Sequence, residues 1–159
     1  MISNSIVRGV LFMNLIFAFT LIFVFSCTLT SESKFVSAAG NGDLEQVKHF
    51  LRKGINVNCR ANDDWTALTI AATEGHLEVI KLLVDYGADI NFKEGGENTA
   101  LFWAAHYGHM NVVIYLLEQG AYPHKKCFDC RTPIEAAAAN GHQNIVQILK
   151  QASVGWVER

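Results

Sequence analysis

The sequence contains little proline and no excess of basic residues. It has only two prolines among 159 residues and no low-complexity run, so we expect no long disordered tail. Lysine and arginine number 13 against 15 aspartates and glutamates, which gives a formal net charge of -2. Proteins that bind nucleic acid usually present a strongly positive face to the phosphates, and this composition does not predict one. The length suffices for one domain with a modest hydrophobic core.

Long hydrophobic runs are absent except near the N-terminus. Residues 10–25 carry no charge and are almost wholly aliphatic or aromatic, and a single positive side chain, Arg8, precedes them. Small or polar residues follow, which is the layout of a secretory signal. A transmembrane helix needs roughly 20 apolar residues, so the run spans a bilayer only if it extends to Leu29. Residues 1–26 are therefore interpreted as a signal peptide or a membrane anchor, and Arg8 favours an inside N-terminus with the domain outside.

Cys27 follows this segment within a recognisable pattern. Val24-Phe25-Ser26-Cys27 resembles the lipobox of bacterial lipoproteins, in which an aliphatic residue stands three positions before the cysteine and a small residue directly before it. In that family the cysteine is acylated and becomes the new N-terminus. Val24 and Ser26 match the pattern, whereas Phe25 is bulkier than the residue usual there. The resemblance implies that Cys27 is a lipidation site, and the alternatives are a cleaved signal and a plain anchor.

The rest of the chain repeats itself every 33 residues. Threonine-containing motifs, paired alanines, Gly-His pairs and isolated glycines each recur at this step. A fixed period of this length indicates a stacked array, because no single unit can bury its own apolar face. The recurring sets are Thr66-Ala67-Leu68, Thr99-Ala100-Leu101 and Thr132-Pro133-Ile134; Ala71-Ala72, Ala104-Ala105 and Ala137-Ala138; Gly75-His76, Gly108-His109 and Gly141-His142; and Gly54, Gly87 and Gly120.

These motifs resemble those of the ankyrin family over about residues 33 to 151. The resemblance implies an all-α repeat solenoid of about four ankyrin repeats, each a helix-turn-helix unit, joined by β-hairpin fingers. The first and last units resemble terminal caps. In this division residues 27–34 are a tether, residues 35–151 the repeat domain with units at about 33–60, 61–93, 94–126 and 127–151, and residues 152–159 a tail.

Several positions of the repeat have predictable structural roles. The threonine before each first helix can cap the helix N-terminus with its hydroxyl. Gly75 and its equivalents follow short first helices, where a left-handed residue is needed. The histidines that follow these glycines occupy a position that is structural in the ankyrin family, so they are assigned to packing. Trp103 is assigned to the core because its equivalents are Ile70 and Ala136.

Ankyrin proteins generally hold their partners with the finger tips and the exposed side of the first helices, so the resemblance implies a partner-binding surface there. Tryptophan, tyrosine and arginine, the residue types that dominate interface energies, occur on this face. Trp65 and Phe102 either contact the partner or cover neighbouring repeats, and both interpretations stay open. The candidate contact residues are Asn62, Asp63, Trp65, Thr69, Thr73, Phe102, His106, Tyr107, Phe128, Arg131 and Glu135.

Cys127 and Cys130 form a C-x-x-C motif at the predicted turn of the last finger. A tight turn brings such Cα atoms within about 7 Å, so the pair is a disulfide candidate, and export would favour oxidation. The alternatives are free thiols and a metal site with His124, although three ligands are one short of a closed zinc site. A redox-active motif should open a helix, and the register places this one in a hairpin. Cys59 lies two repeats away, beyond disulfide reach.

The sequence therefore predicts a non-enzymatic protein–protein interaction module that is exported and tethered to a membrane, or else periplasmic or extracellular. The repeats occupy almost the whole ordered chain and leave no room for a catalytic domain. We expect no cofactor, no metal, a protein partner rather than nucleic acid, membrane association through the N-terminus, and a monomer. The alternative is a metal-binding or thiol-redox accessory protein that uses the finger with Cys127 and Cys130.

Lipidation of Cys27 can be tested by metabolic labelling with a fatty acid in a bacterial host. We expect the full chain to incorporate the label and Cys27→Ala to lose it, because the acyl acceptor is gone. Cys59→Ala, which removes a cysteine within the repeats, should keep the label. An unlabelled wild-type protein released in soluble form would contradict lipidation and support ordinary signal cleavage.

Overall fold

The computed structural model describes residues 31–61, 65–93, 98–124 and 131–157, with side chains as far as residue 153. Within these ranges the regular structure is helical, apart from an antiparallel bridge between Arg60 and Thr66 at the base of the first finger. The predicted all-α array is confirmed. A helical segment at residues 31–40 is followed by α2 (Leu44–Arg52), α3 (Ala67–Glu74), α4 (Leu77–Asp85), α5 (Ala100–Tyr107), α6 (Met110–Glu118), α7 (Pro133–Ala139) and α8 (Gln143–Val157).

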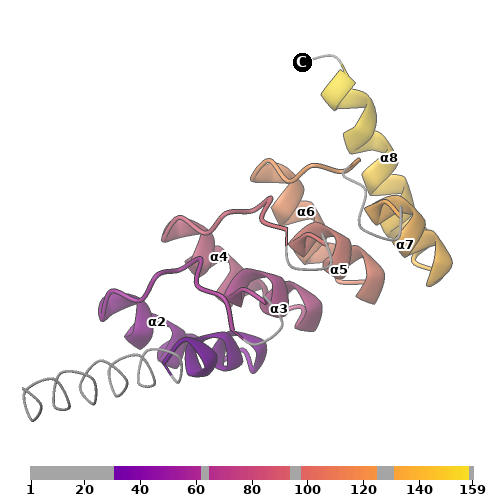
Figure 1. The fold of residues 1–159 in the computed structure, drawn as a ribbon. Helices are drawn as coiled ribbons and strands as arrows, with labels where there is room; N and C mark the ends of the chain where they lie inside the picture. The colour runs from indigo at the N-terminus through magenta and orange to yellow at the C-terminus, as the bar shows by residue number, and fades with distance from the viewer. Residues whose placement is uncertain (1–30, 62–64, 94–97, 125–130, 158–159) are drawn as a thin grey trace, which may run out of the picture.

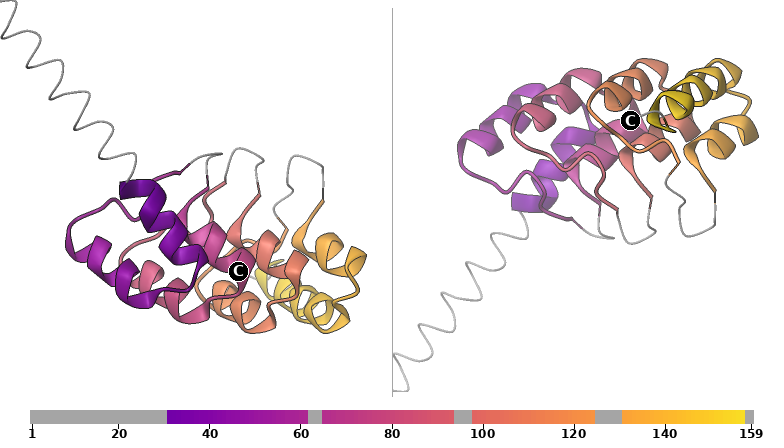
Figure 2. Two further views of the ribbon diagram at one scale, coloured as in Figure 1. Left: turned by 90° about the horizontal axis from the view of Figure 1, so that it is seen from below. Right: turned by 90° about the horizontal axis from the view of Figure 1, so that it is seen from above.

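The helices form helix-turn-helix units that stack side by side in two layers (Figure 1). The first helices α3, α5 and α7 contact one another in sequence, and the second helices α2, α4, α6 and α8 do the same. Figure 2 shows from two further sides that the units follow one another along a single direction. The core lies between the layers, where Leu83 and Leu116 of the second helices are fully buried against the paired alanines of the first. Since these alanines are small, the layers approach closely.

Each first helix from α3 onward begins at the predicted threonine. The hydroxyl oxygens of Thr66, Thr99 and Thr132 accept hydrogen bonds from the backbone N–H three residues later, at 3.2, 3.3 and 3.3 Å. These bonds satisfy N–H groups that the helix itself leaves without partners. α3 and α5 end at Gly75 and Gly108, whose φ angles of +80° and +85° are left-handed. Both predicted signals are confirmed.

The histidine that follows each glycine joins its unit to the preceding one. The Nε2 atoms of His76, His109 and His142 lie 2.9, 2.8 and 3.1 Å from backbone carbonyl oxygens one repeat earlier. Each ring also covers the left-handed glycine of that repeat, and a methyl group added to Gly75 would lie 2.5 Å from Nδ1 of His109. The assignment of these histidines to packing is therefore confirmed, and glycine is required both by its φ angle and by the close ring.

A second set of hydrogen bonds joins the bases of the fingers. The side-chain oxygen of Asn58 accepts from the backbone N–H of Asp89 at 2.8 Å, and its Nδ2 donates to the carbonyl of Gly87 at 3.3 Å. Asn91 bonds Tyr122 and Gly120 one repeat later in the same way, at 2.9 and 3.1 Å. Neighbouring units are thus fixed at two separate edges.

The ends of the array differ from the predicted boundaries. Residues 31–34, assigned to the tether, are helical. The helix runs through Ser33, whereas its equivalent Thr66 stands before α3 as the N-cap residue. At the other end α8 continues to Val157, through part of the predicted tail. The earlier second helices end near a left-handed glycine, but Ser153 stands at that position and donates its hydroxyl to the Leu149 carbonyl at 2.7 Å within the helix.

The N-terminal segment, residues 1–30, lies outside the described residues. The predictions of a signal peptide, an anchor and lipidation at Cys27 refer to this segment and stay predictions. Among the helices of the described ranges, none combines the length and apolar character needed to cross a membrane.

The contact between histidine and glycine can be tested with two matched substitutions. Gly75→Ala and Gly87→Ala both force alanine into a left-handed conformation, which costs about 1–2 kcal/mol. Only Gly75 has a neighbour there, whereas nothing lies within 4 Å of a methyl group at Gly87. We expect Gly75→Ala to lower the free energy of unfolding by at least about 1 kcal/mol more than Gly87→Ala does, because His109 must leave the Thr73 carbonyl. Equal losses in urea denaturation would contradict this account.

Candidate protein-interaction surface

Five aromatic rings gather on the side of α5 that faces away from the second helices. This aromatic cluster consists of Trp65, which precedes α3, and Phe102, Trp103, His106 and Tyr107 of α5. The Trp103 ring packs against Trp65 with centroids 5.3 Å apart and against Tyr107 at 6.0 Å, with interplanar angles of 31° and 22°. Offset packing of this kind is favourable for aromatic rings. The cluster therefore joins two repeats through side chains alone.

His106 contacts three of the other rings in the aromatic cluster. Its ring stacks on Phe102 at 6.1 Å and meets Trp103 and Tyr107 edge to face at 5.8 and 4.8 Å. Asn140, from the last unit, places its Nδ2 atom 3.0 Å from His106 Nδ1 and 2.9 Å from the Ala136 carbonyl. An amide nitrogen only donates, so His106 Nδ1 accepts and the ring carries its proton on Nε2. A third repeat thus holds the His106 ring in place.

The rings of the aromatic cluster differ in their exposure to solvent. The Tyr107 side chain is 51% exposed, whereas Trp65, Trp103 and His106 are half-buried. Phe102 is only 5% exposed, so of its two open interpretations the structure supports the one in which it covers neighbouring repeats. Trp103 was assigned to the core, and this assignment is wrong. The Trp103 ring is half-buried and packs against the small buried cluster of Phe102 and Ala136, and its equivalent Ile70 is half-buried as well.

Thr69 and Thr73 of the predicted contact set have structural roles. Thr69 is 1% exposed, and its hydroxyl donates to the Thr66 carbonyl at 3.0 Å, so it offers nothing to a partner. The prediction that Thr69 contacts a partner is therefore wrong. Thr69 is the third residue of α3, and its side chain points inward and completes the N-terminal cap. The Thr73 hydroxyl donates to the Thr69 carbonyl at 2.9 Å, and the Thr73 carbonyl receives His109. Thr73 is half-buried.

Of the remaining predicted residues, the structure describes Arg131 and Glu135, at the start of the last unit. Arg131 and Glu135 are exposed, and a Glu135 carboxylate oxygen accepts from the Thr132 backbone N–H at 2.6 Å, which completes the cap of α7. Asn62, Asp63 and Phe128 lie outside the described residues, as do Cys127 and Cys130, so the finger-tip contacts, the disulfide and the alternative metal site stay predictions.

The finger bases that lie beside this surface are held rigidly. The Arg60 guanidinium carbon lies 5.3 Å from the centroid of the Phe92 ring, a cation–π contact between two neighbouring fingers. Together with the Asn58 and Asn91 bridges, this contact fixes the fingers relative to each other. Asn140, Trp103 and Phe92 were not among the predicted site residues. Of these, only Trp103 had a signal in the sequence, because it is much larger than its repeat equivalents.

Cys59 lies in the finger base next to this network. It is a free, buried cysteine. Burial raises the pKa of its thiol to about 11 from an ordinary 9.0, and the negative charge of Glu32 acts in the same direction. Since the thiolate is the reactive form, Cys59 stays protonated and inert near neutral pH. Its role is to pack.

Comparison with known proteins agrees with this geometry. A family model described as ankyrin repeats, in three copies, matches residues 35–127 and 97–155. The matched ranges include the helical units and the aromatic cluster. No curated protein matches the chain at a significant level.

Because the pKa of the Cys59 thiol is raised, the free energy of unfolding should change with pH in the alkaline range. The folded chain keeps the Cys59 proton up to about pH 11, whereas an unfolded chain releases it near pH 9. The stabilising contribution is complete below pH 9 and is lost as the pH rises through this window. We expect the melting temperature to fall between pH 9 and 11 in both proteins. The fall should be smaller in Cys59→Ala than in the wild type, because the alanine side chain does not titrate. An identical pH profile for the two proteins would contradict the pKa shift.

Proposed function

The chain belongs to the ankyrin-repeat family, and from this premise we propose that it binds a protein partner through the aromatic cluster and the adjacent fingers, outside the cytosol and tethered to a membrane. Ankyrin repeats are protein–protein interaction modules and are typically not catalytic. The observation that carries the choice of surface is the gathering of four half-buried or exposed rings, Trp65, Trp103, His106 and Tyr107, on one side of the first helices.

These rings suit a binding surface for an energetic reason. Tryptophan and tyrosine supply a large contact area with few rotatable bonds and are enriched among the residues that dominate interface energies. Here each ring is already held by its neighbours, and His106 is also held by Asn140. A partner therefore orders little of this surface on binding, so less of the interaction energy is spent on lost side-chain freedom.

Export and tethering rest on the N-terminal sequence. Residues 10–25 form the apolar run, Arg8 precedes it, and Cys27 follows in a lipobox-like pattern. A tether would confine the module to a membrane surface, where its effective concentration toward a partner in the same membrane is high. The partner is accordingly proposed to be a membrane protein or a protein held at that membrane.

The proposed surface can be tested with variants of the full-length chain and a partner recovered on the immobilised wild type. Tyr107→Ala and Trp65→Ala should each weaken binding by about 1–3 kcal/mol, or about 5- to 150-fold, if the rings are anchors. Tyr107→Phe keeps the ring and should bind nearly as well as the wild type. Titration calorimetry gives the affinities, and circular dichroism checks that each variant is folded.

Two changes on the opposite side of the molecule serve as controls. Glu118 of α6 and Gln147 of α8 are exposed on the second helices, so Glu118→Ala and Gln147→Ala should leave the affinity unchanged. If these two changes weaken binding while Tyr107→Ala and Trp65→Ala do not, the partner binds the second-helix side and the proposed surface is wrong.

A further inference from the structure

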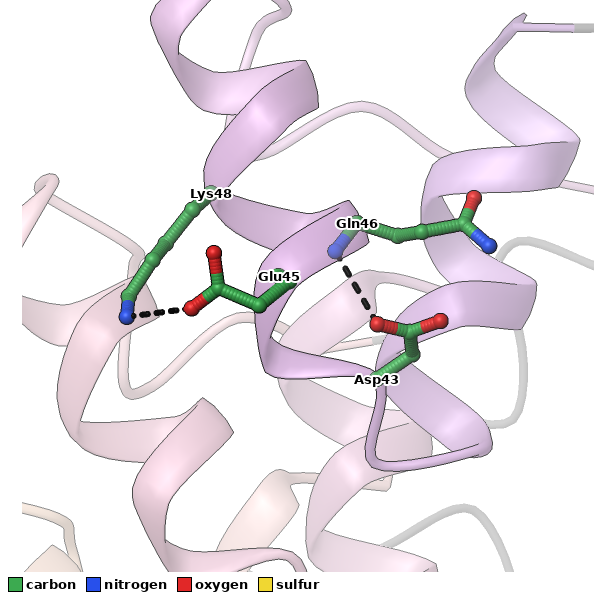
Figure 3. A network of polar contacts seen from close by, with 4 residues as sticks. All are labelled: Asp43, Glu45, Gln46 and Lys48. Carbon is green, nitrogen blue, oxygen red and sulfur yellow. Dashed lines mark hydrogen bonds and ion pairs between the residues drawn. The ribbon is translucent and has the colours of Figure 1, made fainter.

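The first unit of the array is closed by polar side chains on its outer side. Lys34 is exposed where the equivalent residues of the later units are buried alanine or proline, and Gln46 is exposed where they are buried valine or isoleucine. Asp43 replaces the packing histidine and caps α2 by accepting from the Gln46 backbone N–H at 3.0 Å (Figure 3). Beside it Glu45 and Lys48 form an ion pair at 2.8 Å. This end carries the polar residues expected of a terminal unit.

The first helix of the last unit, α7, lacks comparable polar residues on its outer side. Ala138 is exposed, although its equivalents Ala39, Ala72 and Ala105 are each 0% exposed. Ile134 is half-buried, whereas its equivalent Leu101 is fully buried. The last helix, α8, is more polar, with Gln147 and Lys150 exposed. The outer side of α7 thus keeps the residues of an internal repeat, and among the side chains that the structure describes none covers it as an internal repeat is covered.

The three preceding units show what covers this kind of surface. Gly42, Gly75 and Gly108 each lie under the imidazole of the following unit, which also bonds a carbonyl two residues before the glycine. Gly141 has the same left-handed φ, +79°, but nothing lies within 4 Å of the position where a methyl group would be. By the same register the corresponding carbonyl is that of Ala139, which is exposed.

We propose that this end face, formed by Ile134, Ala138, Ala139 and Gly141, binds a repeat-type helix-turn-helix unit of a partner protein, which stacks on α7 as a following repeat. The unit would present small or aliphatic side chains to Ile134 and Ala138 and an imidazole above Gly141. Lys150 is exposed at the rim, where a leucine, Leu117, stands in the preceding unit, so an acidic side chain of the partner would face it. The surface is a continuation of the interface that already joins α3 to α5 and α5 to α7.

A second copy of this chain does not fit as that partner. Stacking head to tail would place Lys34, Asp43 and Gln46 on the apolar end face, where burying a charge without a partner is costly. The polar first unit therefore prevents the chain from forming open-ended filaments of copies, the usual outcome of a head-to-tail contact. The end face stays available for a different protein.

The inference is testable with a probe made from this chain itself. The probe carries Lys34→Ala, Asp43→His and Gln46→Val, which give its first unit the outer side of an internal repeat, and Ala138→Arg, which blocks its own end face. Fluorescently labelled full-length probe is titrated with full-length wild type in mild detergent and followed by analytical ultracentrifugation. We expect a one-to-one complex, whereas labelled chain that carries only Ala138→Arg should form none.

The location of the contact is tested on the receptor chain. Ala138→Arg in the receptor should weaken probe binding at least about 10-fold, because the charge enters an apolar contact. Asn144→Arg adds the same charge at an exposed position of α8 and should not change the affinity. Circular dichroism tests whether the probe is folded. If it is not, it is replaced by a second probe that keeps Asp43 and carries Lys34→Ala, Gln46→Val and Ala138→Arg. Failure of the folded probe to bind at 100-fold excess, or equal binding to wild type and Ala138→Arg, overturns the proposal.

Discussion

Every internal repeat of this array exposes, on its C-terminal side, a surface that it cannot cover by itself. The alanine of that surface, such as Ala72 or Ala105, is fully buried only because the next unit packs on it. The same unit sends a histidine ring over the left-handed glycine and bonds a carbonyl that the short first helix leaves without a partner. Apolar burial supplies most of the attraction, and the hydrogen bond sets the position of the two units. Each unit is therefore stable only as a neighbour of another.

The surface that we propose for partner binding is a consequence of this stacking. The rings of the aromatic cluster come from two repeats, and the fingers are aligned by Asn58 and Asn91, which bond the backbone of the next unit. Because hydrogen bonds join neighbouring units both at the first helices and at the finger bases, the surface cannot move far without loosening the array. The described finger bases and ring side chains are thus held in place before the proposed partner binds.

Residues that repeat are the part of this structure that the sequence predicts well. The 33-residue period identified the units, and the roles of Thr66, Gly75 and His109 followed from single positions, because each depends on local backbone geometry. The errors concern residues that break the period. The equivalents Ile70 and Ala136 predict a core position for Trp103, but Ile70 is itself half-buried, and so is Trp103. Ser153, where a glycine was the rule, let α8 continue to Val157. The contact between His106 and Asn140 links side chains 34 positions apart, and no local sequence pattern predicts it.

His106 links the stacking of the units to the surface that we propose binds a partner. Its backbone carbonyl receives the His142 ring at 3.1 Å, and its own ring receives Asn140 at 3.0 Å, so both bonds come from the junction between α7 and α8. The last unit therefore positions one ring of the aromatic cluster, that of His106. That unit is also the one whose outer side is uncovered, so a protein stacked on the end face would restrain α7 and, through Asn140, the ring of His106. Coupling of this kind requires only that both sites bias the same element, and the short α7 helix is in contact with both. The two surfaces are consequently expected to favour each other's occupation rather than to act independently.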